Sequence, residues 1–225
     1  MIKLGLLGKN ISHSLSPKLY SDIYGEKNVE YSLLDFNEKN QIPPIDKLMI
    51  GLDGLNITSP YKEHFIKDVI IKDDFIRSLA AINCIAKVGE QFFATNTDYS
   101  AMLSLLPDMA KQKHVVILGD GVMSRITQTA CLKIGLQFEV YSRRLTPEKF
   151  NQMELVDENV LVINCCSREY AFNGKITAGL HFWDLNYLHQ AHLQLFKYKK
   201  NYIDGLNLLR EQARDAAAFW SSLKN

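Results

Sequence analysis

A short apolar strand that runs into a glycine turn is the feature that most constrains the fold of this chain. The run from His114 to Leu118 is apolar enough for a strand buried on both faces of a parallel sheet. It leads into Gly119-Asp120-Gly121, and a helical pattern follows over Met123–Ile134. Neighbouring parallel strands need a crossover connection, which is usually a helix. The segment therefore predicts a strand–turn–helix unit of an α/β fold.

The same turn has the spacing of a phosphate-binding loop. Gly119 permits a tight turn, and Gly121 lets backbone N–H groups approach a pyrophosphate. The helix N-terminus adds a partial positive charge. Taken alone, the string fits a plain structural turn equally well, but the flanking strand and helix favour dinucleotide binding. The candidate cofactor residues here are Gly119, Asp120, Gly121, Val122, Met123 and Ser124, with Ser124 in place of a third glycine.

A basic segment at the end of the next strand indicates which dinucleotide would bind. A site that prefers NAD usually has Asp or Glu about 20 residues beyond the turn, on the ribose hydroxyl. This chain has Ser142-Arg143-Arg144 there. Guanidinium groups can bind a 2′-phosphate in a bidentate manner. The segment therefore favours NADP over NAD, and the alternative is a solvated basic loop.

The rest of the chain also alternates short apolar runs with helical patterns, which indicates the α/β fold class. The sequence pattern changes near Asp98–His114, where a polar cluster and a helical pattern give way to a buried strand, and this change marks the expected domain boundary. We expect an N-terminal α/β substrate-binding domain of residues 1–100, with the C-terminal helix 205–225 packing back on it, and a Rossmann-type dinucleotide-binding domain of residues 101–204. Further strands are expected at Ile2–Leu7, Tyr31–Phe36, Gly54–Ile57, Ile82–Val88, Phe138–Tyr141, Val160–Asn164, Phe182–Leu185 and Tyr202–Asp204. Further helices are expected at Lys18–Tyr24, capped by Ser16 before Pro17, after Asp98 up to Pro107, and from Leu206 to Leu223.

Composition excludes several other classes of protein. The formal net charge of +1 gives no global field toward nucleic acid or an anionic membrane. No apolar run approaches the roughly 20 residues of a membrane helix. The cysteines form no CxxC pair and are expected to be buried thiols, so the cytoplasm is the expected location. The basic run 197–200 is expected to be a solvated turn. His189 and His192 are expected to be a solvated surface pair, with no metal site.

Three polar segments stand out in the first half of the chain. Ser14 and Ser16 place two hydroxyls on one side of an extended segment, which suits a polyol or a carboxylate. Lys62 follows a strand end, where α/β folds collect ligands. Asp98 ends a third polar cluster. On spacing alone, a helix cap explains Ser16 and Asp98, and a solvated lysine explains Lys62.

Together these segments resemble the shikimate dehydrogenase family, and the resemblance covers nearly the whole chain. Family members carry HSxSP, NVTxPxK, GAVNT-like and NTD segments, a glycine turn, an arginine segment and a DGxxMLxxQ-like segment. In chain order, the matching residues are His13–Pro17, Asn56–Lys62, Ala80–Cys84, Asn96–Asp98, Gly119–Ser124, Ser142–Arg144 and Asp204–Gln212. Several ordered matches are far more specific than any one of them.

The resemblance implies an oxidoreductase that reduces 3-dehydroshikimate to shikimate with NADP(H), a step of aromatic amino-acid (chorismate) biosynthesis. It assigns Lys62 and Asp98 as the catalytic pair, and it places the cofactor on the glycine turn and on Ser142, Arg143 and Arg144. It implies small-molecule ligands, no nucleic acid or membrane partner, and a monomer or homodimer. The residues that it assigns to the substrate are Ser14, Ser16, Thr58, Asn83, Tyr187 and Gln212.

Two other functions remain open on the sequence. One is a quinate/shikimate-type dehydrogenase with a different cofactor preference. The other is a non-catalytic protein that binds a polyol acid but has impaired cofactor binding. The departures from the family pattern bear on this choice, because Tyr99, Val122, Met123 and Asn207 replace small residues on the cofactor side. The segment between Arg144 and the strand at Val160 is also shorter than in family members.

Overall fold

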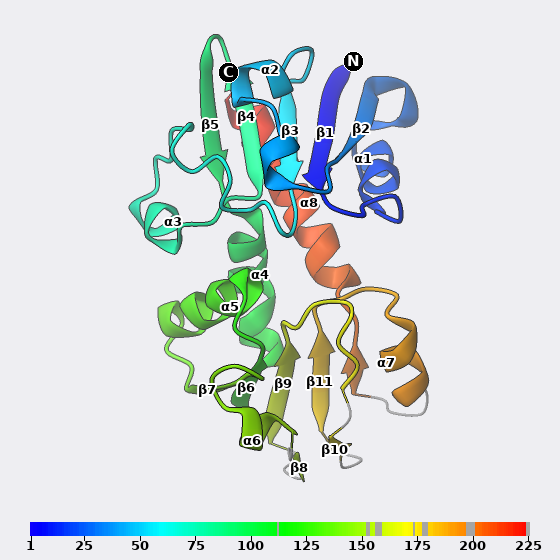
Figure 1. Ribbon diagram of the computed structural model, residues 1–225, viewed down its shortest axis with the longest axis vertical. Coiled ribbons are helices and arrows are strands. Elements are labelled where there is room, and N and C mark those ends of the chain that lie inside the picture. Colours follow the sequence, from blue (N-terminus) through cyan, green and yellow to red (C-terminus); the bar gives the residue numbers. More distant parts are fainter. Residues whose placement is uncertain are drawn as a thin grey trace. The chain divides into compact units, whose positions relative to one another are not determined.

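The chain folds into two compact units, residues 1–100 with 210–225, and residues 101–209 (Figure 1). These limits lie within a few residues of the expected boundaries. Each unit contains a five-stranded sheet with helices, which confirms the predicted α/β class. Within the described residues, no helix is both long and apolar enough to cross a bilayer. The computed structural model describes residues 1–111, 113–151, 154–155, 159–172, 174–176, 180–196 and 201–223, so the basic run 197–200 lies outside it.

The first sheet has the strand order β2-β1-β3-β4-β5. The strands β2, β1 and β3 are parallel, whereas β4 runs antiparallel to both β3 and β5. The carboxyl ends of β1, β3 and β5 and the amino end of β4 therefore meet at one edge. The strands are β1 (Ile2–Gly8), β2 (Val29–Asp35), β3 (Gly54–Ile57), β4 (Cys84–Val88) and β5 (Gln91–Thr95).

Strand β5 was not expected from the sequence. Val88 pairs with Gln91, so Gly89 and Glu90 form a two-residue hairpin turn, and Gly89 has a φ of 59°. A glycine at the first central position is a known signal for such a turn. That signal was present in the sequence, and the short apolar run after it was too brief to stand out.

Two expected helix limits were wrong. Helix α1 (Ser16–Tyr24) has Leu15 at its N-cap, and Ser16 is its first residue. The Ser14 hydroxyl accepts the Ser16 N–H at 3.2 Å, so Ser14 satisfies a donor there. Helix α4 (Thr97–Met109) continues two residues past Pro107, because a proline in the last turn removes one hydrogen bond without ending the helix. The remaining short helices of this unit are η1 (Glu26–Asn28), η2 (Lys39–Gln41), α2 (Ile45–Leu48) and α3 (Asp74–Leu79).

The C-terminal helix α8 (Leu206–Ser222) supplies much of the first unit's core. Its buried residues Ala213, Ala216 and Trp220 pack with Leu4 and Cys84 of the sheet. The Trp220 indole N–H donates to the carbonyl of Ile85 at 2.9 Å. The amphipathic spacing read from the sequence is therefore the face that packs on the strands.

The second sheet has the strand order β12-β11-β9-β6-β7, and every pair in it is parallel. The chain order reverses between β6 and β9, and open sheets of this Rossmann-like kind bind ligands at such a switch point. The strands are β6 (His114–Leu118), β7 (Phe138–Tyr141), β9 (Val160–Asn164), β11 (His181–Asp184) and β12 (Tyr202–Ile203). The helices are α5 (Val122–Lys133), α6 (Pro147–Asn151) and α7 (Gln190–Leu195), and β8 (Glu154–Leu155) pairs with β10 (Lys175–Ile176).

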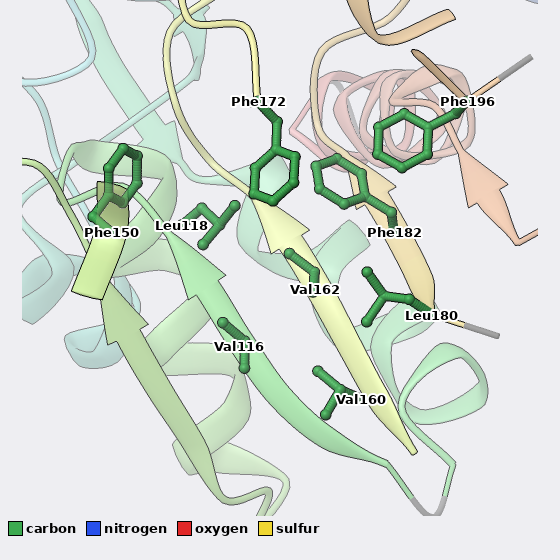
Figure 2. Packing of buried hydrophobic residues seen from close by; sticks show 9 residues of the cluster. All are labelled: Val116, Leu118, Phe150, Val160, Val162, Phe172, Leu180, Phe182 and Phe196. Atoms are coloured by element: carbon green, nitrogen blue, oxygen red, sulfur yellow. The ribbon is translucent and has the colours of Figure 1, made fainter. Parts of the chain in front are cut away.

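One face of this sheet carries an apolar cluster (Figure 2). Val116, Val162 and Phe182 lie in register on β6, β9 and β11. Phe172 and Phe196 pack beside Phe182. The next row toward the carboxyl edge is Leu118, Asn164 and Asp184, so the face changes from apolar to polar at the edge where a ligand is expected.

We predict that Gly54→Ala destabilises the first unit. A Cβ at this position would lie 2.5 Å from Trp220 Nε1, closer than any real contact, so the indole must move away from its acceptor. Overpacking of this kind lowers the free energy of unfolding by about 1–3 kcal/mol. Urea denaturation measures it, with Gly121→Ala as the control because nothing lies within 4 Å of a Cβ there. Equal stabilities of the two variants would contradict the packing described.

Candidate active site

A buried ion pair lies at the polar edge of the first sheet. Lys62 follows β3, and Asp98 lies in the first turn of α4. Lys62 Nζ donates to Asp98 Oδ2 at 2.7 Å, and the two side chains are only 7% and 12% exposed. The structure therefore excludes the two simpler interpretations, a solvated lysine and a helix cap. It brings together an ammonium and a carboxylate that can exchange or orient a proton.

The backbone around this pair is held by amide side chains. Asn83 Oδ1 accepts the Thr97 backbone N–H at 2.6 Å and the Thr97 hydroxyl at 3.2 Å. The Thr97 hydroxyl also lies 3.3 Å from Gln212 Oε1 on α8. Asn96 Oδ1 accepts the Tyr99 N–H, so Asn96 caps α4. These contacts fix the first turn of α4, and with it the position of Asp98.

The two serines expected to bind substrate lie close together. Ser14 Oγ donates to Ser16 Oγ at 3.1 Å, in the segment after β1. Thr58 follows β3, which pairs with β1 through Leu7 and Ile57. The Thr58 N–H donates to the carbonyl of Leu7 at 2.9 Å. All predicted substrate residues except Tyr187, together with Lys62 and Asp98, thus belong to the first unit.

In the second unit, the glycine turn lies between β6 and α5. Gly119 has a φ of 104°, and a Cβ there would lie 3.2–3.3 Å from the backbone of Cys165 and Cys166. Gly121 caps α5 without any side-chain hydrogen bond, and open space lies where its Cβ would be. The N-cap residue of α5 is therefore a glycine whose missing side chain leaves room in front of the helix N-terminus, which suits a pyrophosphate. Ser124 is fully buried and accepts from Gln128 Nε2 at 3.0 Å, so it serves the packing of the helix.

Two arginines follow β7 on the same edge. Arg144 Nε donates to Asp120 Oδ2 at 2.9 Å, and the Ser142 hydroxyl donates to the same oxygen at 3.0 Å. The Arg143 guanidinium lies 5.7 Å from the centroid of the Tyr170 ring. The predicted cofactor residues of the turn and the arginine segment are therefore in direct contact through Asp120.

Tyr187 lies in the segment after β11. The Arg168 guanidinium lies 5.4 Å from the centroid of the Tyr187 ring and donates to the Tyr187 carbonyl at 2.8 Å. Leu188 adopts a φ of 52°, which non-glycine residues rarely adopt. Arg168 thus binds both the ring and the backbone of the residue assigned to the substrate.

The expectation that His189 and His192 are solvated was wrong. Both are buried, and with Asp184 they form a cluster whose potential ligand atoms lie within 4.8 Å of one another. His192 Nδ1 lies 2.6 Å from Asp184 Oδ2. Asn164 and Asn186 donate to Asp184 Oδ1. The spacing of the two histidines was visible in the sequence, but their contact with the Asp184 carboxylate, which belongs to β11, was not.

The protonation of His192 opposes a metal ion at this cluster. The Phe172 backbone N–H donates to His192 Nε2 at 2.8 Å, so the proton of the neutral ring is on Nδ1 and points at Asp184. Metal-bound histidine needs a free lone pair on the ligating nitrogen. Only His189 Nδ1, which is 4.0 Å from Asp184 Oδ2, is buried here without a hydrogen bond. The absence of a metal stays a prediction.

Three contacts among the candidate site residues were not predicted from the sequence. Thr97 links Asn83 to Gln212, Asp120 links the glycine turn to the arginines, and Arg168 binds Tyr187. Asp120 was assigned only a place in the turn. The Thr97 link was signalled by the NTD segment itself, whereas the Arg168 contact depends on tertiary structure.

Comparison with known proteins finds shikimate dehydrogenases among the relatives of this chain. Residues 6–85 match the shikimate dehydrogenase substrate binding domain. A shikimate dehydrogenase (NADP(+)) of Caldicellulosiruptor saccharolyticus is 30% identical over 72% of this chain and 61% of its own length. One from Clostridium botulinum is 26% identical over 98% of this chain and 96% of its own length. The chain is thus similar to shikimate dehydrogenases over nearly its whole length.

A solved structure shares the fold of this chain. The structure of the Thermus thermophilus shikimate 5-dehydrogenase in complex with NADP(H) and shikimate superimposes with a TM-score of 0.79, covering 99% of this chain and 94% of that one at 21% identity. At that identity the likeness establishes the fold. The alignment with the Caldicellulosiruptor enzyme spans less than two thirds of that enzyme.

We predict that His192→Ala lowers the free energy of unfolding by at least about 2 kcal/mol. The change removes a donor to a buried carboxylate and the acceptor of the Phe172 N–H, and hydrogen bonds to charged groups contribute roughly 1.5–3 kcal/mol each. Urea denaturation measures the loss. The matched control is His13→Ala, since His13 is exposed. A loss no larger than the control's would show that the cluster does not stabilise the fold.

Asp184 should also make stability depend on pH. Burial alone would raise the pKa of Asp184, but hydrogen bonds from His192 and Asn186 outweigh burial and hold that pKa below its ordinary value. The resulting stabilisation is present above the unfolded pKa, about 3.9, and is lost as the pH falls through the lower folded value. Between about pH 5 and pH 3, Asp184→Asn should lose less stability than the unmodified protein does. Parallel acid profiles would refute this.

Proposed function

We propose that this protein is an NADP-dependent shikimate dehydrogenase, which catalyses the reversible reduction of 3-dehydroshikimate to shikimate. The observation that carries the proposal is the buried contact of Lys62 with Asp98, at the sheet edge that also carries Ser14, Ser16 and Asn83. The curated relatives bear this activity in their names. The proposal applies their activity to the residues that this chain retains.

Lys62 and Asp98 would handle the proton of the reaction. Reduction of a ketone requires a proton on the carbonyl oxygen as hydride reaches the carbon. The Lys62 ammonium can donate to that oxygen, and Asp98, 2.7 Å away, can orient the ammonium and take up the proton in the reverse direction. The nicotinamide, when bound, supplies the hydride. The near-complete burial of the pair excludes water that would compete for these hydrogen bonds.

The polar residues around the pair would recognise a cyclic polyol acid. The Ser14 and Ser16 hydroxyls and the Thr58 hydroxyl can donate to a carboxylate or to ring hydroxyls. Asn83 and Gln212 present amides, and both contact Thr97. Tyr187 belongs to the second unit, where its ring stacks against Arg168, and its proposed role in substrate binding rests on the family resemblance alone.

The cofactor would lie on the second unit's glycine turn. The backbone from Gly119 to Ser124 would hold the pyrophosphate, and Ser142, Arg143 and Arg144 would meet the 2′-phosphate. The fit rests on the glycine φ of 104° and on the open space at Gly121, the N-cap residue of α5. Val122 and Met123 are partly buried, and each contributes a backbone N–H to the first turn of α5.

We further propose that the protein acts in the cytoplasm as a monomer or homodimer, without nucleic acid. The four cysteines are all free, which accords with a reducing compartment. Burial raises the pKa of the Cys131 thiol and of the Cys166 thiol to about 12, so neither is a reactive thiolate at neutral pH.

We predict that Lys62→Ala lowers kcat by about 100-fold or more, the contribution expected of a positioned proton donor. The assay follows NADPH absorbance with 3-dehydroshikimate. The matched control is Lys67→Ala, because Lys67 is an exposed lysine in the same stretch of turns. Since Lys62→Ala leaves a buried carboxylate behind, Asp98→Asn serves as a second variant with a similar expected loss.

Two outcomes contradict the proposal. A folded Lys62→Ala variant with unchanged kcat would remove Lys62 from the chemistry. A folded, unmodified protein that binds shikimate but turns over neither shikimate nor quinate with NADP or NAD would instead support the non-catalytic binding protein.

A further inference from the structure

The carboxylate of Asp120 joins the glycine turn to the loop after β7. Its Oδ2 accepts from the Ser142 hydroxyl at 3.0 Å and from Arg144 Nε at 2.9 Å. Ser142 is buried, its Oγ accepts the Leu145 N–H at 2.9 Å, and its own N–H donates to Thr146 Oγ1 at 2.9 Å. Asp120 is therefore anchored on a loop that is itself hydrogen-bonded in one conformation.

This contact makes the two arginines unequal. Arg144 is paired with Asp120, whereas Arg143 lies over the Tyr170 ring and has no carboxylate partner among the described residues. Both arginines are exposed to solvent. An anion that arrives at this loop meets one unpaired guanidinium, and it can recruit the second only in competition with Asp120.

The position of Asp120 gives this competition a chemical meaning. In dinucleotide sites, a carboxylate at the end of the second strand binds the ribose hydroxyls, and an arginine there accommodates a 2′-phosphate. In this chain the strand end carries the arginines, and the glycine turn provides the carboxylate. The pairing of Gly119 N–H with the Tyr141 carbonyl at 2.8 Å keeps the two segments adjacent. One loop thus holds both kinds of recognition group.

We propose that Asp120 determines how strongly this site prefers a 2′-phosphate to a 2′-hydroxyl. Because Arg144 is paired with Asp120, it does not bind the 2′-phosphate. Arg143 alone contacts that phosphate, and the preference for NADP over NAD is therefore moderate. The inference rests on the proposed function, because it assumes that a dinucleotide binds at this turn. It goes further by naming the residue that sets the selectivity between the two cofactors.

The test compares two adenosine nucleotides that differ only in the 2′-phosphate, adenosine 2′,5′-bisphosphate and 5′-AMP. Titration calorimetry on the full chain gives the ratio of their Kd values. Asp120→Asn frees Arg144 for the phosphate and should widen the ratio about tenfold, the factor expected for one further charged hydrogen bond. Asp108→Asn is the matched control, because it removes the same charge from an exposed position on α4.

Arginine variants separate this account from a general charge effect. In the otherwise unmodified protein, Arg143→Gln should bring the ratio of the two Kd values close to one. Arg144→Gln should change that ratio less than about twofold. The double variant Asp120→Asn/Arg144→Gln should return to the unmodified ratio, since the coupling lies in the pair. Thermal unfolding of each variant confirms that it is folded.

Different results would overturn the role of Asp120 and the binding of a dinucleotide at this turn. If both nucleotides bind and Asp120→Asn leaves the ratio unchanged, or if Arg144→Gln matches Arg143→Gln, then Asp120 does not set the selectivity. If neither nucleotide binds to the unmodified protein, then dinucleotide binding itself is refuted, and this inference with it.

Discussion

The antiparallel direction of β4 in the first sheet is the constraint on which the candidate site of the first unit depends. Had β4 continued the parallel order of β2, β1 and β3, its first residue would lie at the opposite edge of the sheet. Because it is antiparallel, Asn83 lies beside the end of β3, and the hairpin returns β5 to the same edge. Lys62 and Asp98, 36 residues apart in the chain, thereby come within one hydrogen bond of each other.

Such an edge is stable only if its polar groups have partners. An unpaired polar group in an apolar environment costs free energy, and a lone buried charge costs much more. The polar residues at this edge hydrogen-bond to one another. The Asn83 side chain accepts from the Thr97 N–H, and Lys62 donates to Asp98. The Asn96 side chain accepts from the Tyr99 N–H and donates to the Ala81 carbonyl. A buried ion pair is weak evidence for stability, because desolvation offsets much of the attraction. Its retention is better explained by the proton chemistry proposed above than by folding.

The sequence was most informative where a signal is local. The apolar runs and glycines predicted β1, β3, β6, β7 and β9 and the helix after Gly121, since each depends on a few adjacent residues. Ordered motifs gave the resemblance to the shikimate dehydrogenase family, and through it the proposed roles of Lys62 and Asp98. Contacts between different elements were harder to foresee: His192 is hydrogen-bonded to Asp184 of the strand eight residues earlier, and Arg144 is paired with Asp120, 24 residues earlier. Spacing alone made the buried residues His189 and His192 look like a solvated pair.

The buried cluster around Asp184 also explains why residue 119 must be glycine. Asp184 holds Asn164 at 2.9 Å, and Asn164 Oδ1 accepts the Cys166 N–H at 3.2 Å. Asn186, also bound to Asp184, donates to the Cys166 carbonyl at 3.2 Å. These bonds fix the backbone of Cys165 and Cys166 against the turn, where a Cβ on residue 119 would lie 3.2–3.3 Å from it. The backbone of Cys165 and Cys166 cannot move away from the turn without breaking this hydrogen-bond network around a buried carboxylate. The φ of 104° at Gly119 independently favours glycine. The shape of the proposed pyrophosphate loop is thus set by a network on two strands that contribute nothing to the glycine motif itself.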